Sequence, residues 1–158
     1  MKWIGAALLG GSLLLPPFLA GDFYINLASQ ILIAAIFALS LNLLVGYGGM
    51  TSLGHASYLG VAAYLSALLT SRYGFGHGAA ALISISGTMA MAAFFGVIAL
   101  RATGLGFLMI TLALSQVLWG LAYRMSNVTG GDNGIAGLTR PAPFGISLES
   151  PAAFYWFV

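Results

Sequence analysis

The chain has 158 residues, of which 60% are hydrophobic and only 5% are charged, and its net charge is +2. A soluble domain normally carries about 25% charged residues, so a chain with this little polar surface is expected to have the bilayer as its solvent. The small net charge gives no reason to expect nucleic acid as a partner. Because the chain has no cysteine, and its two histidines and three acidic residues are scattered, the sequence predicts no metal site.

Five apolar segments are expected to cross the membrane. Their apolar runs are long and continuous rather than alternating, which favours helices over barrel strands. Each is close to the ~20 residues that cross ~30 Å of hydrocarbon. The predicted fold is therefore an all-α, polytopic helical integral membrane protein, with spans at about residues 3–20, 23–45, 53–70, 79–100 and 107–123.

The first two segments differ in how clearly the sequence predicts that they cross the membrane. Segment 3–20 follows Lys2 and contains Pro16-Pro17, so it also resembles a signal peptide. We favour a retained span, since the rest of the chain already lies in the membrane. In the second segment, residues 31–45 hold ten Leu, Ile, Phe or Val side chains, which favour insertion by roughly 3–6 kcal/mol.

The C-terminal part of the chain is more polar. Residues 124–151 are rich in Gly and Pro and are expected to form a loop outside the membrane, and residues 152–158 begin a further apolar run. We therefore expect this sequence to be a fragment of a longer permease-like chain, truncated within a span. Basic residues are divided too evenly between the two sides for the positive-inside rule to set the orientation.

The polar side chains within or at the edges of the spans are neutral. Acidic side chains inside a membrane commonly serve proton or ion coupling, so their absence from these spans favours a solute moved without ion coupling in this chain. Each neutral group has a simpler interpretation as a hydrogen-bond donor to a neighbouring backbone or helix. These groups are Ser29, Gln30, Ser40, Asn42, His55, Thr111, Ser115 and Gln116.

A glycine-rich break, LVGYGGMTSLGH (residues 44–55), separates two predicted spans. Its VGYG letters match the core of a potassium-channel filter, but Leu44 replaces the usual threonine and a full-length span precedes it. Ser52 and His55 would share a helix face, which raises a serine-hydrolase hypothesis. An ion channel or a non-transporting membrane scaffold is the alternative function.

A longer match favours a different function. The stretch ALSLNLLVGYGGMTSLGHASYLGVAAYLSALL (residues 38–69) resembles the signature of the LivM-type permease subunit of branched-chain amino-acid ABC importers. LRATGLGFLMITLALSQ (100–116) and TGGDNGIAGL (129–138) resemble two further segments of that family in the same order. The resemblance implies a non-enzymatic permease subunit of an ATP-driven importer for branched-chain or related amino acids, in the bacterial inner (plasma) membrane. It also implies that residues 1–158 are the N-terminal part of the transmembrane permease domain.

The resemblance also implies partners. These are a second permease subunit in a heterodimer, two ATPase subunits and a periplasmic or extracellular solute-binding protein, with the lipid bilayer around them. A phosphate-binding loop needs a lysine, and the only lysine here is Lys2. ATP is therefore expected on the partner subunits, and no cofactor is expected in this chain.

The break is the first candidate site, because irregular backbone in a membrane can face a zwitterionic solute. Thr51 or Ser52 has an alternative role as a helix N-cap. A second motif is expected either to contact the binding protein or simply to turn the chain: Thr129, Gly130, Gly131, Asn133 and Gly134. The candidates for the translocation pathway or helix break are Asn42, Gly46, Gly48, Gly49, Ser52, Gly54, His55 and Thr111.

Overall fold

The computed structural model describes residues 21–138, 142 and 148–158. These residues form helices and connections, and no strand occurs among them, so the all-α prediction is confirmed. The expected span 3–20 lies outside the described residues. The elements are α3 (Asp22–Gly46), α4 (His55–Ser71), α5 (His77–Ala99), α6 (Leu105–Arg124), α7 (Ser126–Thr129), the 3-10 helix η1 (Gly131–Asn133) and α8 (Pro151–Phe157).

The helices α3, α4, α5 and α6 match four of the expected spans to within about two residues at each end. Among the described residues, α3, α5 and α6 are long and apolar enough to cross a bilayer. Helix α4 has 17 residues, at the lower end of the range that spans a membrane. The expected number of about five spans therefore stays a prediction.

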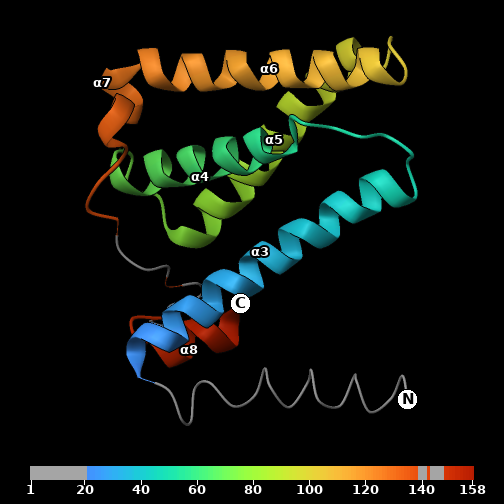
Figure 1. The fold of residues 1–158 in the computed structure, drawn as a ribbon. Helices are drawn as coiled ribbons and strands as arrows, with labels where there is room; N and C mark the ends of the chain where they lie inside the picture. Colours follow the sequence, from blue (N-terminus) through green and yellow to red (C-terminus); the bar gives the residue numbers. More distant parts are fainter. Residues whose placement is uncertain (1–20, 139–141, 143–147) are drawn as a thin grey trace, which may run out of the picture. The chain divides into compact units, whose positions relative to one another are not determined.

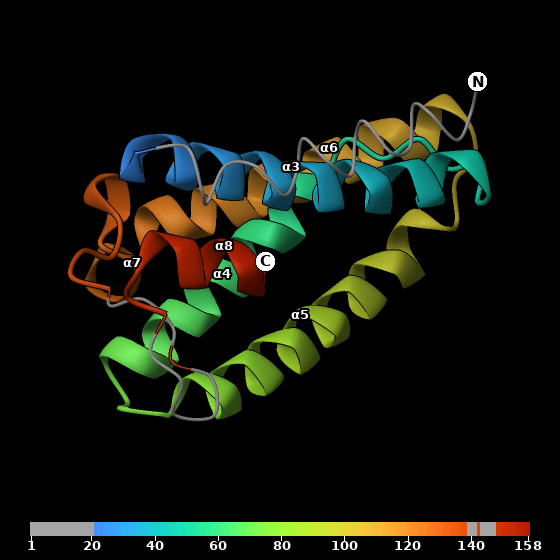
Figure 2. The same cartoon turned by 90° about the horizontal axis from the view of Figure 1, so that it is seen from below.

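The chain divides into two compact units, residues 1–40 with 146–158, and residues 41–145. In the second unit, α4 contacts both α5 and α6. Figure 1 shows α4 below α6, and Figure 2 shows α5 and α6 spreading apart from their connection with α4 between them. Helix α4 is thus the central element of this unit.

Small side chains on α5 allow the close approach of α4. Ala80 and Ser84 are buried, and a Cβ added at Gly87 would lie 3.2 Å from Cδ1 of Leu65 on α4. At Gly96, by contrast, an added Cβ would have no neighbour within 4 Å, so this glycine does not mediate the contact. The close contact of α5 with α4 therefore involves Gly87 rather than Gly96, and α5 also buries Phe95 and Ala99 in its second half.

Hydroxyl groups in the helices bond to their own backbone, as the simpler interpretation of these residues predicted. Ser29 donates to the carbonyl of Ile25 at 3.0 Å, and Ser40 donates to that of Phe37 at 2.8 Å. Ser115 donates to the carbonyl of Leu112 at 2.7 Å. No buried side-chain nitrogen or oxygen in the described part of the chain lacks a partner. These groups are thereby compatible with an apolar solvent.

The first unit contains residues 22–40 of α3 and the short helix α8. Ile25 and Ser29 on α3 are buried, as are Leu148 and Tyr155 near and within α8. Ser150 caps α8 by accepting the Ala153 N–H at 3.1 Å, and Pro151 occupies the first turn, where its missing N–H costs no helix bond. Residues 152–157 of the predicted apolar run are thus helical.

Candidate functional site

The glycine-rich break begins with a sharp end to α3. Gly49 has φ +63°, and its N–H donates to the carbonyl of Val45 at 3.1 Å, which is the αL type of helix termination. A Cβ at Gly48 would fall 2.5 Å from the carbonyl oxygen of Leu44. Glycine is therefore required at Gly49 for its backbone conformation and at Gly48 for space.

This termination is unlike a potassium filter. A filter presents consecutive carbonyls to the ion, whereas Val45 and Gly46 form the last turn of α3. The Val45 carbonyl accepts the Gly49 N–H, so it is engaged in the helix termination. The VGYG letters therefore encode a helix end in this structure.

The second half of the break leads into α4, which begins at His55 rather than at the expected residue 53. The N-cap residue is Gly54, so the assignment of Thr51 or Ser52 as N-cap is wrong. The Ser52 hydroxyl instead accepts the Gly54 N–H at 3.3 Å, two residues along the chain. Because Ser52 precedes the helix, the premise that it shares a helix face with His55 is also wrong.

The break is held against α6 by Thr111. The Thr111 hydroxyl accepts the N–H of Leu53 at 3.3 Å and donates to the carbonyl of Leu108 at 3.0 Å. Thr111 is buried, and a Cβ at Gly54 would lie 2.6 Å from its carbonyl oxygen. The structure therefore joins three of the predicted residues, Ser52, Gly54 and Thr111, in one junction.

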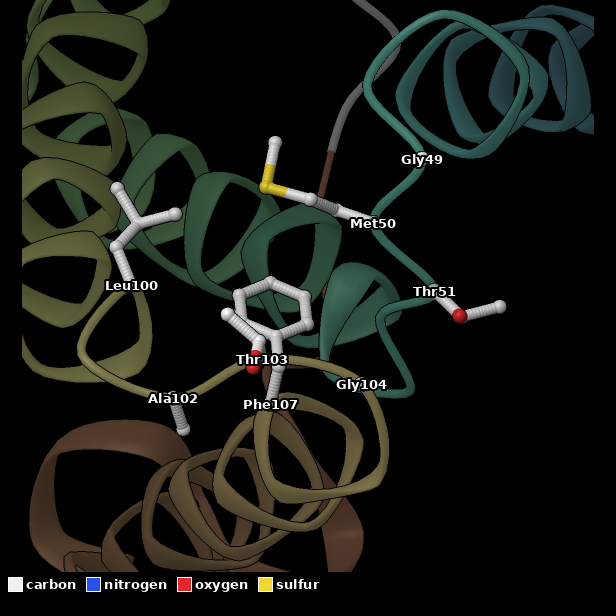
Figure 3. A pocket seen from close by; sticks show the side chains of 8 residues that line it. All are labelled: Gly49, Met50, Thr51, Leu100, Ala102, Thr103, Gly104 and Phe107. Atoms are coloured by element: carbon white, nitrogen blue, oxygen red, sulfur yellow. The ribbon is translucent and has the colours of Figure 1, made fainter.

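A cavity of about 200 Å³ lies beside the break. It is lined by Gly49, Met50 and Thr51 from the break, and by the connection between α5 and α6 with the start of α6. Figure 3 shows Met50 and Phe107 pointing toward a common space, while the Thr51 side chain points away from them. The cavity thus has apolar side chains beside two glycine turns, at Gly49 and Gly104.

The remaining predicted residues of the break are placed around this junction. Asn42 is exposed on α3, and its Oδ1 lies 3.5 Å from the position of a Cβ added at Gly46. His55 is the half-buried first residue of α4. Of the eight predicted residues, Gly49 lines the small cavity. Their role in a translocation pathway stays a prediction.

The TGGDNG motif forms a compact turn after α6. The buried Thr129 hydroxyl lies 2.5 Å from the carbonyl of Ala122 and accepts the Gly131 N–H at 3.2 Å. Asn133 and Gly134 donate back to the carbonyls of Gly130 and Gly131, at 3.2 and 3.3 Å. Since Gly130 has φ +78° and a Cβ there would lie 2.1 Å from the Gly134 carbonyl oxygen, only glycine fits.

This turn is attached to the end of α4. The Arg72 guanidinium donates from Nη1 to the carbonyl of Asn127 at 3.1 Å. Arg72 is the C-cap residue of α4, and α4 contacts α7 directly. The two predicted motifs therefore lie against the same pair of helices, α4 and α6, at opposite ends of α4.

Several cavity residues were missed by the sequence reasoning. Leu100, Ala102, Thr103, Gly104 and Phe107 belong to the segment 100–116, whose resemblance to the family was noted without a role. No spacing rule connects this segment to the break, because the two are about fifty residues apart in the chain. Their contact follows from the packing of α4, α5 and α6.

Comparison of the sequence with known proteins identifies the family of this chain. The sequence model of the family described as "Branched-chain amino acid transport system / permease component" matches residues 23–158. The chain belongs to this family. The match covers the break, the segment 100–116 and the TGGDNG turn.

Two curated relatives support the assignment. The high-affinity branched-chain amino acid transport system permease protein LivM of Escherichia coli (strain K12) is 33% identical over 138 residues, covering 86% of this chain and 32% of the relative. The protein of the same name from Salmonella typhimurium (strain LT2) is 31% identical over 135 residues, covering 84% and 31%. The chain thus spans about a third of the length of these relatives. No solved structure gave a significant match.

Proposed function

We propose that this chain forms part of the permease subunit of an ATP-driven importer for branched-chain or related amino acids. One structural observation supports the proposal in addition to family membership. The non-helical backbone of the break lies against α6 through Thr111, next to a cavity with apolar side chains. Irregular backbone at membrane depth is tolerated where it is buried in protein or lines a cavity, and such breaks bind solutes in transporters.

The break supplies the groups that a zwitterionic amino acid needs. Helix α4 begins just after it, so the positive end of the α4 dipole faces the break and favours a carboxylate. Helix α3 ends just before it, and the negative end of that dipole favours an ammonium group. Met50 and Phe107 provide apolar surface in the adjacent cavity for an aliphatic side chain.

The energy for transport comes from partner subunits in this proposal. A second permease subunit completes the pathway, two ATPase subunits bind and hydrolyse ATP, and a periplasmic or extracellular binding protein delivers the amino acid. The TGGDNG turn is preformed at the end of α6, exposes Asp132 and Asn133, and is a second candidate for contact with a partner. The assembly resides in the bacterial inner membrane.

The test is reconstitution of the transporter with the partners encoded by neighbouring reading frames. Proteoliposomes should accumulate labelled leucine only when ATP and the binding protein are both supplied. Omitting ATP and omitting the binding protein are the two controls. Leucine flux that continues without ATP would contradict the proposal and favour the channel function, and the absence of any flux in the complete system would favour a scaffold.

A further inference from the structure

A second and larger cavity lies between α4 and α6. It is an open groove of about 800 Å³. Its α4 lining extends from Ala56 to Leu68, which at 1.5 Å per residue is about 18 Å along the helix. Met91 of α5 and Trp119 of α6 also line it. The groove is therefore elongated, and its length is more than half of the ~30 Å of hydrocarbon that a solute must cross.

The groove is apolar along its length and polar at one end. Tyr64, Leu65 and Leu118 contribute apolar surface, and Trp119 stacks on Tyr123 with ring centroids 5.5 Å apart. At the end formed by the TGGDNG turn, the lining includes Thr129, Gly131 and Asp132. The Thr129 hydroxyl is engaged within the turn, so the Asp132 carboxylate is the charged group of this end.

We infer that this groove carries the aliphatic amino acid through the permease, with the side chain against α4 and α6 and the ammonium group facing Asp132 when the solute is at the polar end. The inference rests on the proposed function and assigns the solute a set of contacts outside the break. A largely apolar cavity of 300–1,000 Å³ with a few convergent polar groups is the usual form of a small-molecule site.

The position of the groove relative to the two sequence motifs supports a solute rather than a fixed occupant. Ala56 directly follows the break and Gly131 belongs to the turn, so the groove extends from the residue next to the break to the turn. A carboxylate at one end complements the ammonium of a zwitterion. A lipid acyl chain or a packed helix would need only the apolar part of the groove and would leave the carboxylate without a role.

Gly60 allows the groove to be filled without disturbing the fold. A Cβ added at Gly60 would have no neighbour within 4 Å, and the same holds for Gly120 on α6, which does not line the groove. In the assembled transporter, Gly60→Leu should reduce leucine uptake at least tenfold, whereas Gly120→Leu should transport normally. Normal uptake by Gly60→Leu would overturn the inference. Failure of that variant to assemble with its partners would overturn it too, because it would identify the groove as a helix-packing surface.

The polar end is tested by Asp132→Asn, with Asp22→Asn on α3 as the matched control. Loss of the carboxylate should raise the KM for leucine about tenfold with little change in maximal rate, the scale of one charge-assisted hydrogen bond. An unchanged KM would refute the role of Asp132. Wild-type transporter that shows no ATP-dependent uptake refutes the proposed function instead, so the two failures are distinguishable.

Discussion

Gly54 and Thr111 meet where the glycine-rich break lies against α6, and a Cβ on Gly54 would fall 2.6 Å from the Thr111 carbonyl oxygen. The neighbouring Leu53 N–H donates to the Thr111 hydroxyl at 3.3 Å. Thr111 thus accepts a hydrogen bond from the break and limits how closely the break can approach α6. This contact makes the start of α4 dependent on α6.

Replacing Gly54 should show that the approach is close. Gly54→Ala places a methyl group against backbone that cannot rotate away, so we expect a loss of about 1–3 kcal/mol of stability. Thermal unfolding in detergent measures the effect, with Gly120→Ala as the control because that site has open space. Equal midpoints for the two variants would contradict the close contact.

The Thr111 hydroxyl should contribute to the stability of the fold separately from the packing at Gly54. Thr111→Val keeps the shape but leaves the N–H of Leu53 without its acceptor, which we expect to cost about 0.5–1.5 kcal/mol. Thr111→Ser retains the hydroxyl and should recover most of that hydrogen-bond contribution. If the serine variant is no more stable than the valine variant, the hydrogen bond has no measurable role.

The end of α3 should tolerate substitutions according to backbone geometry. Gly49→Val must adopt a left-handed conformation at a cost of about 1–3 kcal/mol and should lose leucine uptake, whereas Gly49→Asn should retain more of it. Gly48→Val should also lose uptake, because its Cβ meets the Leu44 carbonyl. Gly78→Val, on an exposed and open position of α5, is the control. Normal uptake by the Gly48 and Gly49 valine variants would contradict the requirement for glycine.

The TGGDNG turn and the segment after it contain a matched pair of glycines with the same backbone φ. Gly130 and Gly137 both have φ +78°, but an added Cβ meets the Gly134 carbonyl only at Gly130. Both alanine variants incur backbone strain of about 1–2 kcal/mol, and Gly130→Ala should lose more because the turn must open. Hydrogen exchange at the Gly131 and Gly134 amides measures that opening. Similar exchange in the two variants would show that the turn is not closed by this contact.

Much of the fold follows from local properties of the chain. The bounds of α3, α4, α5 and α6 were predicted to within about two residues, because the length of an apolar run and the glycines beside it are local features. The start of α4 was predicted two residues too early. Serine is a residue type favoured at helix N-caps, but the Ser52 hydroxyl accepts the Gly54 N–H in a turn before the helix. Local propensity alone does not distinguish these two hydrogen bonds.

The sequence by itself determined the membrane class, the family and the two glycine-rich motifs, because composition, hydropathy and ordered motifs require no knowledge of contacts. Only the tertiary structure decided that Leu53 bonds to Thr111, which is 58 residues away, and that Gly49 shares a cavity with Phe107. It also decided that α4 and α6 form a groove from the first turn of α4 to Asp132. These relationships depend on how helices pack side by side, and helix packing brings together residues whose separation in the chain carries no signal of their contact.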